Sequence, residues 1–510
     1  MLVKNFRPSN PDTQYTEESI ITDFKYTRPI VEKQGEEYVV GSKTEEVTFK
    51  VDRKVPKLGM LIVGLGGNNG TTVFGMVEAN KQKMTWQQRD RVVEANYYGS
   101  LTQVATSRLG RIGNEDVYTK FGNLLPMVDP DDVVIGGWDI NGMNLGDAMK
   151  RASVFDPELQ EKLYPYMKEV VPMPGVYYAD FIAENQRERA DHILPGSKKD
   201  HLTAIREQLR DFKANNGCDQ LVVMWSGNTE RYCGLVDGIN DTKENLLKAI
   251  DDDSEYISPS QIYAIACILE GVPYINGSPQ NTLIKSVMDL AYEHNVLIAG
   301  NDFKSGQTKI KSVLADYLVG AGLKMRSIVS YNHLGNNDGR NLSSQACFRS
   351  KEISKGGVVD DVIDSNEILY PDESHHPDHC VVIKYVPFVG DSKRAMDEYT
   401  SEIAMGGFNT LVLHNTCEDS LLAAPIILDL VLLTELFTRV YYKTSEMDDF
   451  EQTDCILSIL GYLLKQPLFA EGQPVINALF RQRVCLENTM KAIAGLPIDT
   501  EIGLEQRTCL

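Results

Sequence analysis

Residues 60–80, MLIVGLGGNNGTTVFGMVEAN, decide the fold. They begin with a short apolar run, continue through a glycine-rich turn at 64–70, and end in a helix-like segment. A strand, a glycine turn and a helix in this order make a GxGxxG-like motif credible as a dinucleotide fingerprint. The glycines let backbone N–H groups approach a pyrophosphate, whose charge then sits at the helix N-terminus. The segment therefore predicts a nucleotide-binding α/β domain.

The fingerprint is imperfect. Asn69 occupies the position of the third glycine, and Gly70 follows one place later. No carboxylate ends a clear second strand about twenty residues on, where such domains hold a ribose. Taken alone, the turn leaves nucleotide binding open.

Further parallel strands are expected along the chain. Short apolar runs at 132–135, 221–225 and 296–299 end in polar residues or glycine, and helical stretches such as 200–214 and 259–270 separate them. Alternating strands and helices imply an open, mostly parallel sheet with ligands at the carboxyl ends of its strands. The polar residues that follow two of these runs, at 226–231 and 276–279, are therefore expected to line a cofactor crevice.

The pattern changes after Lys309. Alternating strands at 326–331 and 381–386 predict a sheet with one face covered by helices, in an α+β domain inserted into the first. The apolar run 421–437 is interrupted by a proline and two acidic residues, and predicts a buried helix. Near the start of the chain, 38–40 and 47–51 are expected to be strands separated by a turn at Gly41-Ser42.

The composition excludes several classes of function. The 510 residues carry 72 acidic and 51 basic side chains, a formal net charge of -21. This balance argues against nucleic acid and against anionic membranes as partners. The nine cysteines form no CxxC pair, which favours reduced thiols in a cytoplasmic protein. The N-terminus has no apolar core typical of a secretory signal.

Residues 301–355 contain a positive cluster within this acidic chain. Two glycine turns, KSGQ at 304–307 and GNNDG at 335–339, lie there together with Lys304, Lys309, Lys311, Lys351 and Lys355. Such turns present backbone N–H groups, which together with nearby lysines form a cradle for an anion such as phosphate. A solvated lysine-bearing surface would look similar for either turn alone. Both turns together, downstream of a nucleotide fingerprint, favour a phosphate site.

Five blocks are similar to those of one family. NDFKSGQTK (301–309), SYNHLGNNDG (330–339), FRSKEISK (348–355), KYVPFVGDSKRAMDEYTSE (384–402) and LHNTCEDSLLAAPIILDL (413–430) resemble the signature blocks of eukaryotic myo-inositol-1-phosphate synthases. The resemblance covers nearly the whole chain, as far as LKQPL at 464–468. GxGGNNG is the variant that this family uses. GWDIN at 137–141 resembles the block whose aspartate holds the ribose.

The resemblance implies three sets of site residues. NAD would be bound by Gly64, Gly66, Gly67, Asn68, Asn69, Gly70, Asp139, Asn141, Ser226, Gly227, Asn228, Thr229, Gly277, Ser278 and Asp419. The substrate would be bound by Ser305, Gly306, Gln307, Leu334, Asn336, Asn337 and Asp338. Catalysis would fall to Lys351, Lys393, Lys465, Lys355 and Asp302, with no metal. Ser226-Gly227 stands where relatives often have Thr-Ala, which loosens the assignment of individual contacts.

The implied reaction converts D-glucose 6-phosphate to 1D-myo-inositol 3-phosphate. It proceeds by NAD-dependent oxidation at carbon 5, enolisation at carbon 6, aldol closure onto carbon 1 and re-reduction. Oxidation needs a base, and the later steps develop negative charge on oxygen, which ammonium groups stabilise. Lysines can supply both functions, because desolvation and like-charge neighbours lower their pKa.

The lysines are also expected to divide the work. Lys355 lies four residues after Lys351, on the same helical face, and is expected to keep it partly neutral as the base for the carbon 5 hydroxyl. Lys355 and Lys393 are expected to supply charge at the phosphate. Asp338 is expected to orient a lysine, because an uncompensated carboxylate would repel the substrate.

Two other functions share parts of this pattern. An NAD-dependent sugar-phosphate dehydrogenase would have the same fold and fingerprint, but it would not explain the lysine cluster. A catalytically inactive dinucleotide-binding protein would not need those lysines either. The run 375–379, HHPDH, matches no standard zinc spacing and predicts a loop ahead of a strand.

The expected fold class is α/β, a Rossmann-like doubly wound parallel sheet with an inserted α+β catalytic and tetramerisation domain. Residues 1–58 would form an arm that packs on the main domain, and 59–308 the NAD-binding domain. Residues 309–420 would form the inserted domain, and 421–510 a helical segment that returns to the NAD-binding domain. In the family the inserted sheet forms the core of a tetramer, so the resemblance implies a homotetramer.

Overall fold

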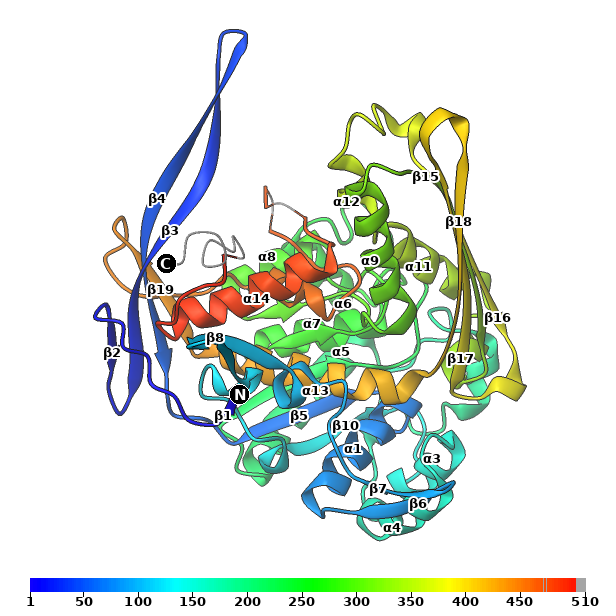
Figure 1. The fold of residues 1–510 in the computed structure, drawn as a ribbon. Coiled ribbons are helices and arrows are strands. Elements are labelled where there is room, and N and C mark those ends of the chain that lie inside the picture. Colours follow the sequence, from blue (N-terminus) through cyan, green and yellow to red (C-terminus); the bar gives the residue numbers. More distant parts are fainter. Residues whose placement is uncertain (471, 474, 501–510) are drawn as a thin grey trace.

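A six-stranded parallel sheet lies at the centre of the molecule (Figure 1). The protein is described by a computed structural model covering residues 1–470, 472–473 and 475–500; the side chains at positions 355 and 356 lie outside that description. Across the sheet the strands are β11 (Met173–Pro174), β10 (Val134–Asp139), β5 (Leu58–Val63), β12 (Gln220–Trp225), β13 (Tyr274–Asn276) and β14 (Ile298–Ala299). When the six strands are numbered along the chain, their order across the sheet is 3-2-1-4-5-6, which is the order of doubly wound dinucleotide-binding folds. The predicted Rossmann-like doubly wound sheet is confirmed.

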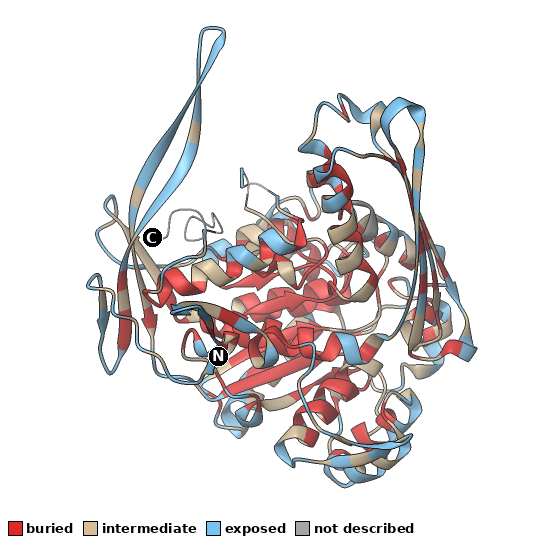
Figure 2. Cartoon of the chain, in the orientation of Figure 1, coloured by how far each residue is buried: buried red, intermediate tan, exposed pale blue. Residues whose placement is uncertain are grey.

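Helices cover both faces of this sheet (Figure 2). One face carries α1 (Asn68–Lys81), α3 (Leu145–Ala152), α4 (Pro157–Met167), α13 (Asp419–Thr438) and α14 (Leu479–Ile493). The other face carries α5 (Lys198–Asn215), α6 (Lys243–Asp251), α7 (Pro259–Leu269) and α8 (Lys285–His294). Successive residues of β5 alternate between the two cores, Met60 and Ile62 in one and Leu61 and Val63 in the other. Burial on both sides explains why this strand is a continuous apolar run.

The helix α13 is the central helix of one core. Among the described residues it is the helix long and apolar enough to cross a membrane, but 83% of its most apolar window is buried inside the protein. It contacts α1 and β12, both from the first half of the chain. The expectation of a buried helix at 421–437 is therefore confirmed.

A second sheet of four strands lies to one side of the first (Figure 1). Its strands are, in order, β16 (Asp378–Tyr385), β15 (Lys324–Leu334), β17 (Ser392–Glu402) and β18 (Phe408–Glu418). One face packs on α9 (Gly306–Gly320), α10 (Asn337–Asn341), α11 (Gln345–Gly356) and α12 (Asp360–Asp364). The other face exposes Tyr331, Met396, Phe408 and Val412.

The N-terminal arm differs from the prediction. β3 (Ser19–Gln34) and β4 (Glu37–Asp52) form one long hairpin that projects from the body of the protein (Figure 1). The expected turn at Gly41-Ser42 is wrong, because Gly41 pairs with Ile30 inside an unbroken ladder. The chain instead reverses at Gly35, whose φ of 66° suits glycine. At its base β3 pairs with β2 (Thr13–Tyr15), and β4 with β19 (Val440–Thr444), which is followed by β20 (Glu451–Gln452).

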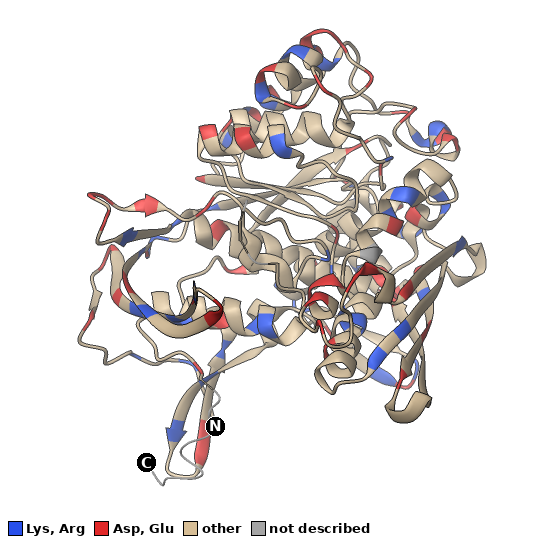
Figure 3. Cartoon of the chain, turned by 90° about the horizontal axis from the view of Figure 1, so that it is seen from above, with Lys and Arg blue, Asp and Glu red and all other residues tan. Residues whose placement is uncertain are grey.

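The remaining elements are small. β1 (Leu2–Val3), β9 (Glu115–Lys120) and β8 (Thr106–Ile112) form one sheet, β6 (Thr85–Gln88) and β7 (Arg91–Glu94) a hairpin, and α2 (Leu101–Val104) a single turn. Charged residues of both signs are scattered over the outer helices, loops and hairpins (Figure 3). The domain boundaries after residues 58, 308 and 420 stay predictions.

Candidate active site

A pocket opens where the direction of the strand order reverses, between the carboxyl ends of β5 and β12. This is the position at which doubly wound sheets bind dinucleotides. At two glycines of the turn after β5 there is no room for a side chain. A Cβ on Gly70 would lie 2.3 Å from the carbonyl oxygen of Leu65, and one on Gly64 would lie 2.7 Å from the Cα of Gly227. The turn therefore exposes bare backbone at the N-terminus of α1, as a pyrophosphate site requires.

Asp139 ends β10, the strand next to β5, and lines the pocket. Its carboxylate accepts hydrogen bonds from the backbone N–H of Gly66 at 2.9 Å and of Asn141 at 3.0 Å. Burial raises the pKa of Asp139, although Asn141, Arg189 and other neighbours partly oppose this. An acidic side chain at the end of the second strand is the group that holds a ribose in this fold.

Two buried donors in the pocket wall are free to bind a ligand. The indole N–H of Trp225 and the hydroxyl of Tyr177 have no hydrogen-bond partner within the described part of the chain, and both residues line the pocket. Buried donors of this kind are costly unless a ligand or water satisfies them. The bare glycine turn, Asp139 and these donors together fit NAD.

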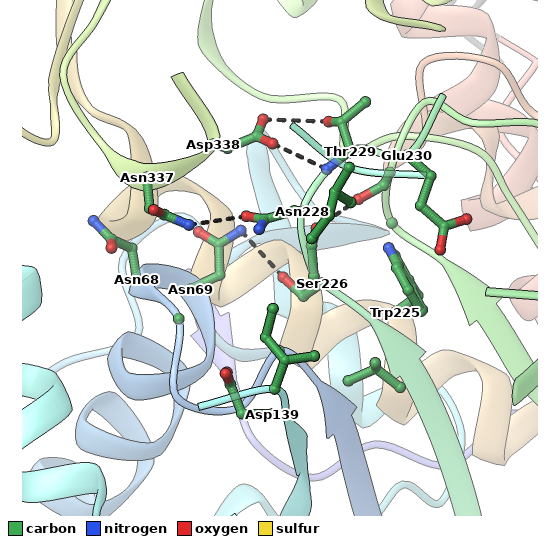
Figure 4. A pocket seen from close by; sticks show the side chains of 18 of the residues that line it. Asn68, Asn69, Asp139, Trp225, Ser226, Asn228, Thr229, Glu230, Asn337 and Asp338 are labelled. Carbon is green, nitrogen blue, oxygen red and sulfur yellow. Dashed lines mark hydrogen bonds between the residues drawn. The ribbon is translucent and has the colours of Figure 1, made fainter. Parts of the chain in front are cut away.

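The short helix α10, which follows the second sheet's strand β15, is hydrogen-bonded to the loop after β12 (Figure 4). The amide of Asn337 donates to Asn228 and to Gln186, both at 3.0 Å. The carboxylate of Asp338 accepts from the backbone N–H of Thr229 at 3.0 Å and from its hydroxyl at 3.3 Å. These hydrogen bonds go to the loop at 226–229, while the charge of Asp338 also raises the pKa of Lys351. The expectation that Asp338 orients a lysine stays a prediction.

A second connection joins the glycine turn to the neighbourhood of Lys393. Asp391 accepts from the amide of Asn68 at 3.2 Å and from the hydroxyl of Ser420 at 2.7 Å. The ammonium of Lys393 lies 3.7 Å from the carboxylate of Asp419, and both residues line the pocket. Cofactor and lysine groups thus share one cavity.

The centre of the lysine cluster is the buried carboxylate of Asp302. Its Oδ1 accepts from Lys351 Nζ at 3.1 Å, and its Oδ2 accepts from Lys465 Nζ at 3.0 Å and Ser354 Oγ at 2.9 Å. The backbone brings the distant partners together, because the N–H of Lys465 also donates to the carbonyl of Asp302 at 2.8 Å. Residues 302 and 465 are far apart in the sequence but adjacent here.

The two lysines on Asp302 differ in charge. Burial lowers the pKa of Lys465 to about 7, with Lys351 and Lys393 adding to the effect and Asp302 opposing it. Burial would also lower the pKa of Lys351, but Asp302 and Asp338 reverse this and raise it above the ordinary value. The expectation of a partly neutral Lys351 is therefore wrong, and of the two lysines on Asp302 it is Lys465 whose pKa lies near neutral.

Asp302 stays ionised between these lysines. Burial alone would raise its pKa, but the attraction of Lys351 and Lys465 outweighs burial and holds the pKa well below the usual range. A fixed anion between two ammonium groups of different pKa gives the site one permanent cation and one proton acceptor.

The helix α9 begins at the edge of the same pocket. Ser305 precedes the helix and lines the cavity, so the N-terminus of α9 is positioned for an anion. Gln307 donates from Nε2 to Asp397 at 2.5 Å. Leu334, the last residue of β15, is packed in a small apolar core with Leu342 and Ile383.

Most residues predicted for the site do meet there. The pocket is lined by Gly64, Gly67, Asn68, Asn69, Asp139, Ser226, Gly227, Asn228, Thr229, Gly277, Ser278, Asp302, Ser305, Asn336, Asn337, Asp338, Lys351, Lys393, Asp419 and Lys465. Gly66, Gly70, Asn141, Gly306, Gln307 and Leu334 are not in the lining. The predicted role of the Lys355 side chain lies outside the described residues.

Sequence reasoning placed Glu230 in the expected 226–231 lining, but it missed two other polar contributors, Asp391 and Ser354. Glu230 lines the pocket, and burial raises its pKa to about 7. Asp391 connects the two domains, and Ser354 touches Asp302. The sequence spacing could have predicted Ser354, because it follows Lys351 by three residues and so lies on the same helical face.

The fold and the site define a class: a Rossmann-type NAD-binding enzyme whose cofactor pocket contains a buried lysine–carboxylate centre. The model of the family described as myo-inositol-1-phosphate synthase matches residues 58–491. The chain is 55% identical to inositol-3-phosphate synthase isozyme 1 of Arabidopsis thaliana, over 99% of this chain and 100% of the relative. It is also 55% identical to inositol-3-phosphate synthase of Dictyostelium discoideum, over 99% of both.

A solved structure agrees with these relatives. The crystal structure of inositol-3-phosphate synthase from Caenorhabditis elegans has a TM-score of 0.97 and 48% identity, and the match covers 99% of each chain. The chain belongs to the myo-inositol-1-phosphate synthase family.

Proposed function

We propose that the protein converts D-glucose 6-phosphate to 1D-myo-inositol 3-phosphate, with NAD as a cofactor that is regenerated in each cycle. The full-length identity to named synthases supports this function. The observation that carries it is Asp302 between Lys351 and Lys465, inside the same pocket as the glycine turn. A simple dehydrogenase has no need of a second, permanently charged lysine.

NAD, when bound, supplies the oxidation at carbon 5 and the later reduction, so the reaction has no net redox change. Its pyrophosphate would rest on the backbone of residues 64–70 and its ribose on Asp139. The loop at 226–229 and Asn337 would close the same end of the pocket.

The lysines on Asp302 would divide the proton and charge chemistry. Lys465 is neutral in part of the molecules near pH 7, so it can take the proton from the carbon 5 hydroxyl. Lys351 remains an ammonium group, so it can stabilise the negative charge that develops on oxygen during enolisation and aldol closure.

The phosphate would bind at the N-terminus of α9. Ser305 lies at that end, and Asn336 and Asn337 border the same cavity. Lys393, whose side chain is largely buried, would supply the opposite charge. Backbone N–H groups and an ammonium group together match the needs of a phosphate dianion.

The decisive assay incubates the protein with glucose 6-phosphate and NAD and measures periodate-labile phosphate. We expect inositol phosphate to accumulate without steady growth of absorbance at 340 nm. Steady NADH accumulation with no inositol phosphate would instead support a sugar-phosphate dehydrogenase.

We also propose that the protein is a cytoplasmic homotetramer. The exposed apolar residues Tyr331, Met396, Phe408 and Val412 on the second sheet support an interface with another copy. The eight cysteines in the described part of the chain are free thiols, which suits a reducing compartment. Light scattering after size exclusion should give four chains, and Val412→Asp should give a smaller species.

A further inference from the structure

The helix α11 directs two buried serines toward different partners. Ser350 and Ser354 are both 0% exposed. Ser350 Oγ donates to the backbone carbonyl of Glu230 at 2.8 Å, whereas Ser354 Oγ donates to Asp302 Oδ2 at 2.9 Å. Each serine makes one hydrogen bond from the same helix, but that of Ser354 reaches the charged centre.

The hydrogen bonds on Asp302 are unequally divided. Lys351 is the partner on Oδ1, whereas Lys465 shares Oδ2 with Ser354. A hydroxyl that donates to Oδ2 draws the charge of that oxygen toward itself. Less of the charge then remains to stabilise the ammonium form of Lys465.

We propose that Ser354 is a positioning residue, whose hydroxyl divides Asp302 between the two lysines so that Lys465 serves as proton acceptor and Lys351 as fixed cation. This inference rests on the proposed function. Among the described hydrogen bonds, Ser354 Oγ bonds to Asp302 and to neither lysine, so it acts on them through that carboxylate. Its hydroxyl group is completely buried where it meets the shared oxygen.

The other charged groups around the centre do not depend on this serine. Lys465 faces Asp302, Lys351 and Lys393. Lys351 faces Asp302, and also Asp338 and Asp419 from α10 and α13. All of these side chains are retained when Ser354 is changed, so a shift in the titration of Lys465 reports on the lost hydroxyl.

The test compares Ser354→Ala with Ser350→Ala. In Ser354→Ala the freed charge on Oδ2 stabilises the ammonium form of Lys465, so the acid limb of the kcat profile should move to higher pH by ~0.5–1 unit. The KM for glucose 6-phosphate should stay within about twofold. Ser350→Ala also loses one buried hydrogen bond, but it should keep the wild-type limb. Ser354→Thr retains the hydroxyl and should keep the wild-type limb as well.

A second readout does not depend on turnover. The pH dependence of Lys465 acetylation, followed by peptide mass spectrometry with NAD absent, measures the titration of that amine directly. An unchanged Lys465 titration in Ser354→Ala, or an equal shift in Ser350→Ala, would overturn the inference. Absence of inositol phosphate from the wild-type protein would refute the proposed function, and the acetylation profiles would still decide the role of Ser354.

Discussion

Lys351 and Lys465 bind the same carboxylate, and matched substitutions can separate their roles. Lys465→Met removes the proton acceptor, so a single turnover should form bound NADH at least about a hundredfold more slowly. Lys351→Met removes the fixed cation, so NADH should appear but cyclisation should fail. Absorbance at 340 nm in stopped flow measures the first event, and periodate-labile phosphate measures the second.

The assay should be run near pH 8.5. Without Lys351, Lys465 loses a like-charged neighbour and its pKa rises. A higher pH therefore keeps it available as the acceptor. Both variants should bind NAD normally, since the described hydrogen bonds of the two lysine side chains go to Asp302 and not to the glycine turn. If Lys351→Met fails to form NADH while Lys465→Met forms it at the normal rate, the roles are reversed.

A pH profile of the wild-type enzyme tests the same assignment. The neutral form of Lys465 is the active one, so kcat should fall as the pH drops below its pKa of about 7. Lys351 has a raised pKa and Asp302 a lowered one, so neither group titrates in this range. A rate independent of pH between 6 and 8 would remove Lys465 from the role of base.

At the scale of the elements, the turn between β5 and α1 allows a specific prediction about NAD binding. A methyl group at Gly70 would lie 2.3 Å from the Leu65 carbonyl oxygen, closer than any Cβ can approach. Gly70→Ala should therefore distort the turn and weaken NAD binding at least about tenfold. Isothermal titration with NAD measures the change.

Gly234→Ala is the matched control. A Cβ added at that glycine would meet nothing within 4 Å, so the substitution should leave NAD affinity unchanged and stability within about 0.5 kcal/mol. Wild-type affinity in Gly70→Ala would show that the turn can relax, and that close backbone approach is not what holds the cofactor.

The same elements show how far the sequence can be interpreted. The strand at β5, its glycine turn and α1 follow from a continuous apolar run and local turn chemistry, so they were predictable. The hairpin of β3 and β4 could not be predicted in this way. Gly41-Ser42 has the composition of a turn, and only the pairing of Ile30 with Gly41 in the structure shows that it lies within a strand. The charge of Lys351 depends on Asp302, a contact between segments that only the tertiary fold brings together.

At the scale of the whole molecule, buried lysines should make stability rise with pH. Burial lowers the pKa of Lys304 and Lys465 to about 7, and of Lys309 and Lys311 to about 8. In the unfolded chain these groups titrate near 10.5. Between pH 7 and about 9 the unfolded state therefore binds more protons, and the free energy of unfolding increases. Each neutral lysine contributes up to ~1.4 kcal/mol per pH unit.

Urea unfolding at a fixed protein concentration measures this slope. Lys304→Met removes one of the titrating groups. The free energy of unfolding should then rise less steeply with pH, by up to ~1.4 kcal/mol per pH unit, which corresponds to about one proton. Lys285→Met changes an exposed lysine and should leave the slope as it is. Above about pH 9 the raised pKa of buried thiols such as Cys233 acts in the opposite direction. A free energy of unfolding that falls steadily from pH 7 to 9 would contradict the prediction.

The late position of α13 and Lys465 in the chain matters for biosynthesis. The first strand of the nucleotide sheet leaves the ribosome about 400 residues before Lys465, which at ~5–20 residues per second is a delay of roughly 20–80 s. During that time β5 and α1 lack the helix that covers them. We therefore expect this half to complete its folding only after α13 has been made, with its apolar surfaces exposed until then. A message cut short before codon 465 yields a chain without the proposed proton acceptor, so we expect its product to form no inositol phosphate.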